Sequence, residues 1–511
     1  MLLDNVSFVV SEGQKVAIVG DNGVGKSTVM RLIGGDETGA TGTIRVDGRL
    51  GIMRQLVGSA QDETTLRQFF VSLATVTLRE TDAKIHRLEI AVTADASDRN
   101  GVRYAAALAA WGELGGYALE VLWDTVTTVV LALPFASVGE RRLATFSGGE
   151  QKRLALEILL RGDDDILMLD EPDNFLDIPG KRWLEEQLQS TRKTVLFVSH
   201  DRELLAAGAT KIVTLEGRGA WTHGDSFTTW RAARDARAQR LDDEHRRWAD
   251  ERDRLFQMMR EMKRRAALND SNASRARAME TRLRHFDDQG PPPEKAKDQK
   301  ITMRLGGSRS GKRAVIIQQL SLDGLTYPFD AEVMYSERIG VLGRNGTGKS
   351  HFMRLLSGDT VAHEGSWRLG ASVVVGYFNQ THDHPELRGR TLLAILQARD
   401  LERGAAMGRL KRYEIHGCSE QPWETLSGGQ QARFQILLLE LAGANLLLLD
   451  EPTDNLDLAS AEALEDALGQ FDGTVLAVTH DRWFLRGFDR FLVFDQHGNV
   501  TEELEPDTAW A

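Results

Sequence analysis

Short, unbroken runs of apolar residues recur along both halves of the chain, and each has the length of a β-strand. In sequence order they are KVAIVG (residues 15–20), ILMLD (166–170), VLFVSH (195–200), RIGVLG (338–343), LLLLD (446–450) and VLAVTH (475–480). Such runs are typical of strands that are buried on both faces. Segments such as residues 150–161, EQKRLALEILLR, have the spacing of a helix with one apolar face. Each half is therefore predicted to be an α/β domain, with a parallel sheet covered by helices.

The middle of the chain has a different pattern, in which apolar residues are sparse and regularly spaced among charged ones. One set recurs every seven residues, and a second set follows at spacings of three, four and three: Leu241, Trp248, Leu255 and Met262, then Ala276, Met279, Leu283 and Phe286. These spacings predict two antiparallel helices joined near residues 266–274, and the first could project roughly 50 Å. Residues 290–300, GPPPEKAKDQK, break the helix and return the chain to the second half. We therefore divide the chain into residues 1–227, 228–300 and 301–511.

Composition limits the classes of protein that this chain can represent. A length of 511 residues is too great for one core and indicates two or three domains. No stretch approaches the ~20 apolar residues that a membrane helix needs, and the first residues do not read as a secretion signal. Cys418 is the only cysteine, which excludes an internal disulfide and a cysteine-rich metal site. We expect a cytoplasmic protein without membrane insertion.

A glycine-rich loop follows the first strand of each half, in the pattern GxxxxGK[ST]. Backbone N–H groups of such a loop, at the start of a helix, can surround phosphate groups. Lys26 and Lys349 should reach the β- and γ-phosphates, and Ser27 and Ser350 should bind Mg²⁺. A glycine-rich turn that binds nothing is the alternative, but the strand–loop–helix context occurs twice. The predicted nucleotide-binding residues are Gly20, Asp21, Asn22, Gly23, Val24, Gly25, Lys26, Ser27 and Thr28, and Gly343, Arg344, Asn345, Gly346, Thr347, Gly348, Lys349, Ser350 and His351.

Four further motifs follow each loop in the same order, so the two halves form an internal repeat. Gln55 and Gln380 are candidates for nucleotide and metal contact through their place in this order. Each half next has a Ser-Gly-Gly motif: Ser147, Gly148 and Gly149, and Ser427, Gly428 and Gly429. The first residue of each is expected to cap a helix.

An Asp-Glu pair at the end of an apolar strand, and a histidine at the end of the next, complete the set in each half. Asp170 and Asp450 can hold the magnesium shell, and the following carboxylates, Glu171 and Glu451, can polarise the attacking water. A buried strand with a polar end is a weak alternative, because burying adjacent carboxylates is costly without a cation or a catalytic task. The last predicted catalytic residues are His200 and His480, each before Asp-Arg.

Taken together, these motifs resemble the signature of ATP-binding cassette (ABC) proteins over both halves of the chain. The resemblance implies an ATPase in which the two cassettes pair head to tail within one molecule, with ATP and Mg²⁺ as ligands. Ser427, Gly428 and Gly429 would close over the ATP held by Lys26. The triplet Ser147, Gly148 and Gly149 would close over the ATP held by Lys349. We expect a monomer in which ATP joins the halves and its hydrolysis releases them.

Two fused cassettes, a charged helical linker and no membrane segment together resemble the F subfamily of ABC proteins. DEPDNFLD (residues 170–177) and DEPTDNLD (450–457) are similar to that family's DEPTNHLD. The interval from Gln55 to Ser147 exceeds that from Gln380 to Ser427 by 45 residues. The extra segment, about 73–120, resembles the helical arm of the family's first cassette. The resemblance implies action on the ribosome and tRNA, in translation or in antibiotic resistance by ribosome protection.

The charge pattern of the linker agrees with a nucleic-acid partner. The candidate RNA contacts are Arg260, Lys263, Arg264, Arg265, Arg275, Arg277, Arg282 and Arg284, against Glu261, Asp270 and Glu280. This segment has a charge of +5 in a chain of −12, so the remainder is strongly acidic. A basic projection on an acidic body suits insertion into RNA. A solvated charged spacer is the alternative for this hairpin.

Some positions depart from the family pattern. The aromatic residue that usually stacks on adenine has no counterpart before the first loop, unless the true start lies upstream; in the second cassette Tyr327 or Phe329 could fill this role. Asp173 and Phe175 stand where the family has Thr and His, and His351 replaces a Thr. We still predict hydrolysis at both sites. The other functions considered are the energising ATP-binding subunit of a transporter and a DNA-maintenance ATPase.

Overall fold

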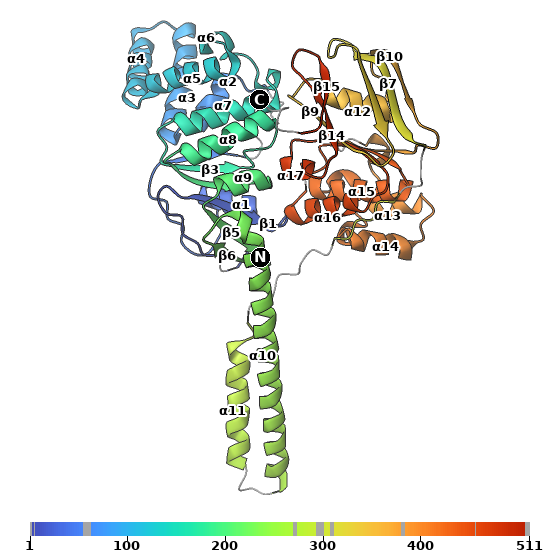
Figure 1. Cartoon of the computed structure of the whole chain (residues 1–511). Coiled ribbons are helices and arrows are strands. Elements are labelled where there is room, and N and C mark those ends of the chain that lie inside the picture. The colour runs from blue at the N-terminus through green and yellow to red at the C-terminus, as the bar shows by residue number, and fades with distance from the viewer. Residues whose placement is uncertain are drawn as a thin grey trace.

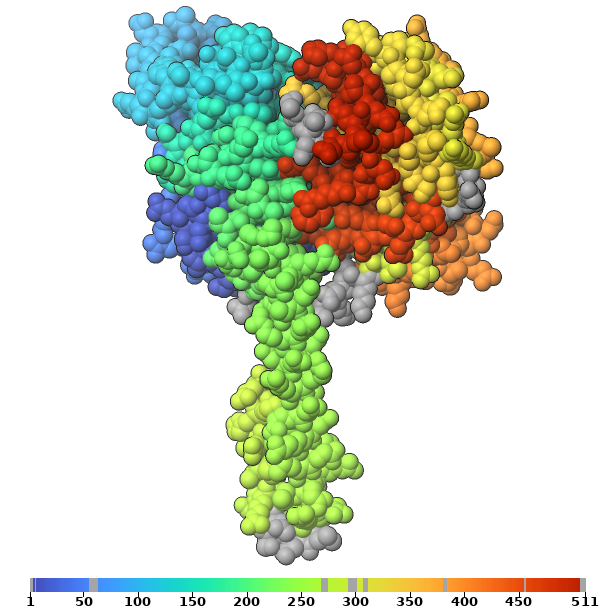
Figure 2. Space-filling model, viewed as in Figure 1, coloured from blue at the N-terminus to red at the C-terminus, as the bar shows by residue number. Residues whose placement is uncertain are grey.

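The computed structural model describes residues 3–505 except 5, 55–62, 269–272, 293–300, 307–310, 380–383 and 455. Two α/β lobes lie side by side, and a pair of long helices projects away from both of them (Figure 1). The space-filling view shows the same two lobes in contact above the projecting helices (Figure 2). The predicted fold class, two α/β domains joined by an antiparallel helical pair, is confirmed.

The first lobe is built on a six-stranded sheet in the order β2-β3-β4-β1-β5-β6. Its strands are β1 (Lys15–Gly20), β2 (Leu50–Met53), β3 (Ile166–Asp170), β4 (Thr194–Val198), β5 (Lys211–Glu216) and β6 (Gly219–His223). All pairs are parallel except β5 with β6. Along β1, Ala17 and Val19 pack into one apolar cluster while Val16 and Ile18 pack into another. The strand is thus buried on both faces, as its unbroken apolar run predicts.

The second lobe repeats this sheet in the order β11-β12-β13-β9-β14-β15. Its strands are β9 (Arg338–Gly343), β11 (Val375–Phe378), β12 (Leu446–Asp450), β13 (Thr474–Val478), β14 (Arg490–Phe494) and β15 (Val500–Glu503). An antiparallel sheet in the order β10-β7-β8 lies beside it, formed by β7 (Arg313–Leu322), β8 (Phe329–Met334) and β10 (His363–Leu369). We refer to the two lobes as the first and second cassette.

Helices cover both sheets. The first cassette has α1 (Lys26–Ile33), α2 (Leu66–Leu73), α3 (Val76–Ala94), α4 (Asp98–Glu113), α5 (Gly116–Leu131), α6 (Phe135–Val138), α7 (Gly148–Arg161), α8 (Ile178–Ser190) and α9 (Arg202–Gly208). The second has α12 (Lys349–Ser357), α13 (Leu392–Gln397), α14 (Arg403–Arg412), α15 (Gly428–Ala442), α16 (Leu458–Gly469) and α17 (Arg482–Leu485). Short 3-10 turns are η1 (Leu143–Thr145), η3 (Pro385–Leu387), η4 (His416–Cys418) and η5 (Trp423–Thr425).

The segment that is longer in the first cassette folds as helices α3, α4 and α5, at the end of the lobe farthest from the helical pair (Figure 1). The helices extend to Leu131, beyond the expected end near residue 120. Trp111 and Trp123 are buried where α4 and α5 meet. Within the described residues, no single helix is long and apolar enough to cross a membrane. The pair α4 and α5 meets that criterion only when joined, and its axes are bent by 67°.

The linker forms a hairpin of α10 (Phe227–Leu268) and α11 (Ala273–Gln289). Its predicted apolar seam is present, since Leu255 and Leu283 are buried and Trp248 stacks on Phe286 with ring centroids 5.7 Å apart. At its base, the indole N–H of Trp230 donates to Thr214 Oγ1 at 2.8 Å. The hairpin is thereby attached to strand β5 of the first cassette.

Candidate ATP sites

Each glycine-rich loop lies between a central strand and the helix that follows it. In the first cassette β1 ends at Gly20 and α1 begins at Lys26. The second repeats this arrangement, because β9 ends at Gly343 and α12 begins at Lys349. The loops therefore place residues 20–28 and 343–351 at a helix N-terminus, where backbone N–H groups attract anions.

Both loop lysines fold back over their own loops. Lys26 Nζ donates to the carbonyl oxygens of Gly20 at 2.7 Å and Asp21 at 3.1 Å. Lys349 Nζ donates to those of Gly343 and Arg344, both at 2.8 Å. Burial lowers the pKa of both ammonium groups, because a charged form is costly away from water. A nucleotide polyphosphate would supply the negative charge that these buried cations need.

A serine and an aspartate adjoin each loop in the arrangement expected of a magnesium site. Ser350 Oγ donates to Asp450 Oδ1 at 3.2 Å. Asp170 and Asp450 are buried at the ends of β3 and β12, and burial raises the pKa of each to about 6. Among the described atoms, Asp170 Oδ1 is buried without a hydrogen-bond partner. A buried carboxylate oxygen of this kind fits a hard divalent cation.

The Ser-Gly-Gly motifs begin helices α7 and α15, as predicted. Ser147 Oγ accepts from the backbone N–H of Glu150 at 3.2 Å, and the Glu150 carboxylate accepts from the Ser147 N–H at 2.7 Å. Ser427 and Gln430 form the same reciprocal capping box. Each motif therefore presents the N-terminus of a long helix.

One cavity of about 420 Å³ contains residues from both cassettes. It is lined by the Ser-Gly-Gly motif of the first cassette and by the loop, Asp-Glu pair and histidine of the second, including Ser147, Gly148, Gly149, Lys349, Ser350, His351, Asp450, Glu451 and His480. Asn345 Nδ2 donates to the Phe175 carbonyl oxygen at 3.1 Å across it. At the other loop, the Asn22 N–H donates to Asp457 Oδ2 at 3.2 Å. The loop of each cassette thus faces the other cassette, the head-to-tail arrangement that the resemblance implies.

The ABC transporter family model matches residues 3–174 and 328–454. Over 99% of this chain and 96% of the relative, an antibiotic resistance protein of Mycobacteroides abscessus is 50% identical. The chain belongs to the ABC-F family of ATP-binding proteins. It is an ATPase with two ATP-binding cassettes.

Other comparisons agree with this ABC-F assignment. The tylosin resistance ATP-binding protein TlrC of Streptomyces fradiae is 32% identical, over 94% of this chain and 92% of TlrC. The ABC transporter F family member 5 of Arabidopsis thaliana is 28% identical, over 95% of this chain and 71% of that protein. A crystal structure of archaeal ribosome recycling factor aABCE1 with the stalk protein aP1 has a TM-score of 0.56 and 19% identity, covering 98% of this chain and 87% of that one. That likeness concerns the fold.

In the second cassette of this ABC-F ATPase, the catalytic candidates meet at the carboxyl ends of β12 and β13. Asp450 lies opposite Val478 in the parallel pair of β12 and β13, which places Glu451 beside His480. The His480 N–H donates to Glu451 Oε2 at 3.0 Å, and His480 Nε2 lies 3.2 Å from Asn345 Oδ1. Burial lowers the pKa of His480 well below its ordinary value, so its ring is neutral. A neutral imidazole can accept or donate a hydrogen bond at the terminal phosphate.

The corresponding groups of the first cassette are arranged differently. Glu171 Oε2 accepts from Asn174 Nδ2 at 2.7 Å. Neither ring nitrogen of His200 has a hydrogen-bond partner among the described atoms, and burial lowers the pKa of this histidine to about 3. Glu171 and Glu451 both have a positive φ, near 50°. The two sites have the same backbone strain but different side-chain partners.

Two ion pairs, largely shielded from water, join the cassettes, and no motif in the sequence indicated them. Arg202 pairs with Glu465, and Arg482 pairs with Glu185. These pairs occupy matching positions of the two repeats, because each arginine follows the His-Asp of its cassette. The recurrence of His-Asp-Arg in both halves of the sequence could have indicated that these arginines have a shared role. No sequence pattern indicated which glutamate would lie opposite.

The structure places the remaining predicted residues as follows. Gln55 and Gln380 lie outside the described residues. Phe329 is buried against Phe352 and Phe494, whereas Tyr327 is 63% exposed. Tyr327 is thus the one of these two rings that is accessible for stacking on adenine.

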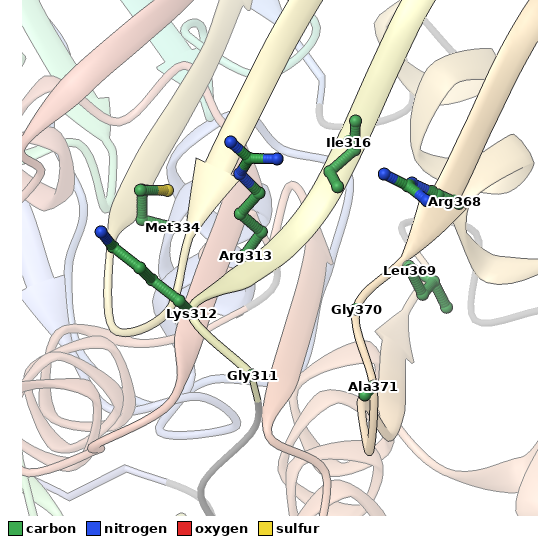
Figure 3. A pocket seen from close by; sticks show the side chains of 9 residues that line it. All are labelled: Gly311, Lys312, Arg313, Ile316, Met334, Arg368, Leu369, Gly370 and Ala371. Atoms are coloured by element: carbon green, nitrogen blue, oxygen red, sulfur yellow. The ribbon is translucent and has the colours of Figure 1, made fainter.

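A second cavity, of about 450 Å³, lies on the antiparallel sheet of the second cassette and contains none of the predicted ATP-site residues. Figure 3 shows the side chains of Lys312, Arg313 and Arg368 around it. Arg313 is paired with Glu332 at 3.3 Å.

Proposed function

We propose that this ABC-F ATPase acts on the ribosome and tRNA, in translation or in antibiotic resistance by ribosome protection. The observation that carries the proposal is the basic hairpin that projects from the paired cassettes (Figures 1 and 2). All eight of its candidate RNA-contacting cations are exposed. Exposed cations on a narrow projection can reach phosphates that the acidic cassettes would repel.

Some of these cations already have partners within the hairpin. Lys263 pairs with Glu280 at 2.8 Å, and Arg264 and Arg265 pair with Glu261 at 3.1 and 2.9 Å. Exposed pairs of this kind contribute little to stability because water screens them, so RNA phosphates can compete for the cations. The proposal is also supported by two relatives of nearly the same extent, whose names state antibiotic resistance and tylosin resistance.

For hydrolysis we assign the same roles in each cassette. Lys26 and Lys349 hold the β- and γ-phosphates, and the Ser-Gly-Gly motif of the opposite cassette closes over them. Ser27 and Asp170, and Ser350 and Asp450, would hold Mg²⁺, which supplies charge neutralisation of the phosphates when bound. Glu171 and Glu451 orient the attacking water, while His200 and His480 contact the terminal phosphate.

ATP binding in the closed cassettes would set the position of the hairpin. Trp230 attaches α10 to the first cassette, and Arg231 of the same helix pairs with Glu462 of the second at 2.9 Å. The base of the hairpin therefore contacts both cassettes. Because ribosomes lie in the cytoplasm, we place the protein there.

The test is a variant that binds ATP without cleaving it, Glu171→Gln with Glu451→Gln. We expect it to co-sediment with ribosomes through a sucrose cushion at least about tenfold more with ATP than without, because unhydrolysed ATP keeps the cassettes closed. A matched control adds Lys26→Ala and Lys349→Ala, which should remove the ATP dependence. Recovery with membranes and not with ribosomes would favour a transporter subunit and contradict the proposal.

A further inference from the structure

The first cassette has three buried charged residues that the second cassette lacks. Lys152, Asp173 and Lys181 are buried. Counted from the shared motifs, the matching positions of the second cassette are Ala432, Thr453 and Ala461. Burying a charge is costly unless it has partners, so three charges at one place require an explanation beyond packing.

Lys181 lies on α8, where the cassettes meet, and bonds to both of them. Its Nζ is 2.9 Å from Asp201 Oδ2 of its own cassette. The same ammonium donates to the carbonyl oxygen of His480 in the second cassette at 3.3 Å. Burial alone would lower the pKa of Lys181, but Asp201, Asp173 and Asp454 raise it above its ordinary value. Lys181 is therefore protonated, and its ammonium group bonds to the second cassette from the first.

The backbone of His480 connects Lys181 to the proposed catalytic carboxylate. The carbonyl of His480 accepts from Lys181, while its N–H donates to Glu451 Oε2 at 3.0 Å. Its ring lies between Glu451 and Asn345, with Nε2 3.5 Å from Glu451 Oε1. A single residue thus separates Lys181 from the group that orients water in the second site.

Among the described residues, no lysine makes the matching contact at the first site. Ala461, at the matching position of α16, has no side-chain group that could donate to the His200 carbonyl. His200 also has no ring partner among the described atoms, and Glu171 is bonded to Asn174 of its own cassette. The two ATP sites therefore differ at Lys181 and Ala461, and also in the contacts of their catalytic glutamates and histidines.

We propose that Lys181 is a positioning residue for the ATP site of the second cassette, supplied by the first cassette when the two close. Closure brings the ammonium onto His480, and His480 then holds Glu451 in place for the attack of water. The two sites consequently turn over at different rates, with the second site dependent on closure. This inference rests on the role proposed for Glu451.

The test is Lys181→Met, which keeps the length of the side chain and removes its charge. It is measured in two backgrounds: Glu171→Gln, where the second site alone hydrolyses ATP, and Glu451→Gln, where the first site alone does so. With the second site active, we expect kcat to fall about tenfold and KM for ATP to change by less than about twofold. With the first site active, the fall should be below about threefold, because Asp201 still accepts from the Leu204 N–H at 3.0 Å.

A second variant removes Asp173 together with Lys181, so that this buried carboxylate is not left without the lysine. Asp173→Thr with Lys181→Ala copies the second cassette's own residues at these two positions. Lys152 is kept, because its Nζ donates to the carbonyl oxygen of Glu171 in the first site at 2.8 Å. This variant should fold and show the same selective loss of second-site kcat. An equal loss in both backgrounds, or none in either, would overturn the inference. Hydrolysis that persists in Glu171→Gln with Glu451→Gln would instead refute the proposed catalytic carboxylates.

Discussion

At the end of β9, Gly343 has a φ of 141°, and a Cβ atom added there would lie 2.2 Å from the carbonyl oxygen of Phe494. Gly20 has the same relation to Leu215 in the first cassette, at 2.5 Å. These glycines are therefore required by a neighbouring strand as well as by the phosphates. Gly346 also has a positive φ, of 84°, but no atom lies within 4 Å of an added Cβ.

This contrast predicts different costs for two similar substitutions. Gly343→Ala should lower the free energy of unfolding by about 2–4 kcal/mol, because β14 would have to move. Gly346→Ala should cost about 1–2 kcal/mol, since only backbone strain is added. Urea denaturation of both variants without nucleotide measures the difference. Equal costs would show that the contact with Phe494 does not constrain the loop.

The hairpin of α10 and α11 is stabilised by a narrow apolar seam and by ion pairs between the helices. Arg252 pairs with Asp287 at 2.8 Å in addition to Lys263 with Glu280. Because these contacts use residues of one face, the cations on the other faces remain exposed. This separation allows a test in which charge is removed while the seam is kept.

We predict that changing Arg264, Arg265, Arg275 and Arg277 to Gln weakens ribosome binding and flattens its dependence on salt. Each lost phosphate contact should reduce the slope of log K against log salt by about 0.7–0.9. The matched control changes Arg240, Arg246, Arg247 and Arg254, which are exposed nearer the cassettes. Binding is measured by co-sedimentation at several salt concentrations. Equal effects of the two sets would leave the hairpin as a charged spacer.

The two cassettes are joined by ion pairs at matching positions of the internal repeat, Arg202 with Glu465 and Arg482 with Glu185. In the pair of Arg482 and Glu185 the side chains are 16% and 13% exposed. Removing one partner of such a pair leaves a poorly solvated charge, at a cost below the roughly 3–5 kcal/mol of a fully buried pair. Arg486 and Glu203 also pair across the interface, but Arg486 is 60% exposed and its pair is worth about 0–1 kcal/mol.

We predict that ATP compacts the Glu171→Gln, Glu451→Gln variant and that Arg482→Glu prevents this compaction. Exchanging the charges, with Glu185→Arg added, should restore most of it. The control Arg486→Glu should have little effect. Small-angle X-ray scattering with and without ATP measures the radius of gyration. Failure of the exchanged pair to restore compaction, with the protein folded, would contradict this account of closure.

Much of the architecture was predictable because local sequence determines it. The four leucines before Asp450 leave no polar position in the body of β12, as expected of a strand buried on both faces. Ser147 and Ser427 were recognisable as helix caps because a capping box lies within four residues. The phosphate loops were predictable for the same reason, since their glycines and lysines act within one turn of backbone.

The sequence could not show whether Tyr327 or Phe329 is placed to stack on adenine. Both are aromatic, and only the structure shows that Phe329 faces the core while Tyr327 is exposed. The burial of Lys152 and Lys181 could not be predicted from the sequence either. Lys181 reads as an ordinary surface cation on a helix until the second cassette is placed against it.

The sequence by itself determined the strands, the helices, the phosphate loops and the repeat, since each depends on residues close together in the chain. Only the tertiary structure decided which residues of the two repeats contact each other. Lys181 and His480 are 299 residues apart, and they meet because two separately folded domains pack together. Contacts of this kind depend on the shapes of whole surfaces, which no local pattern encodes.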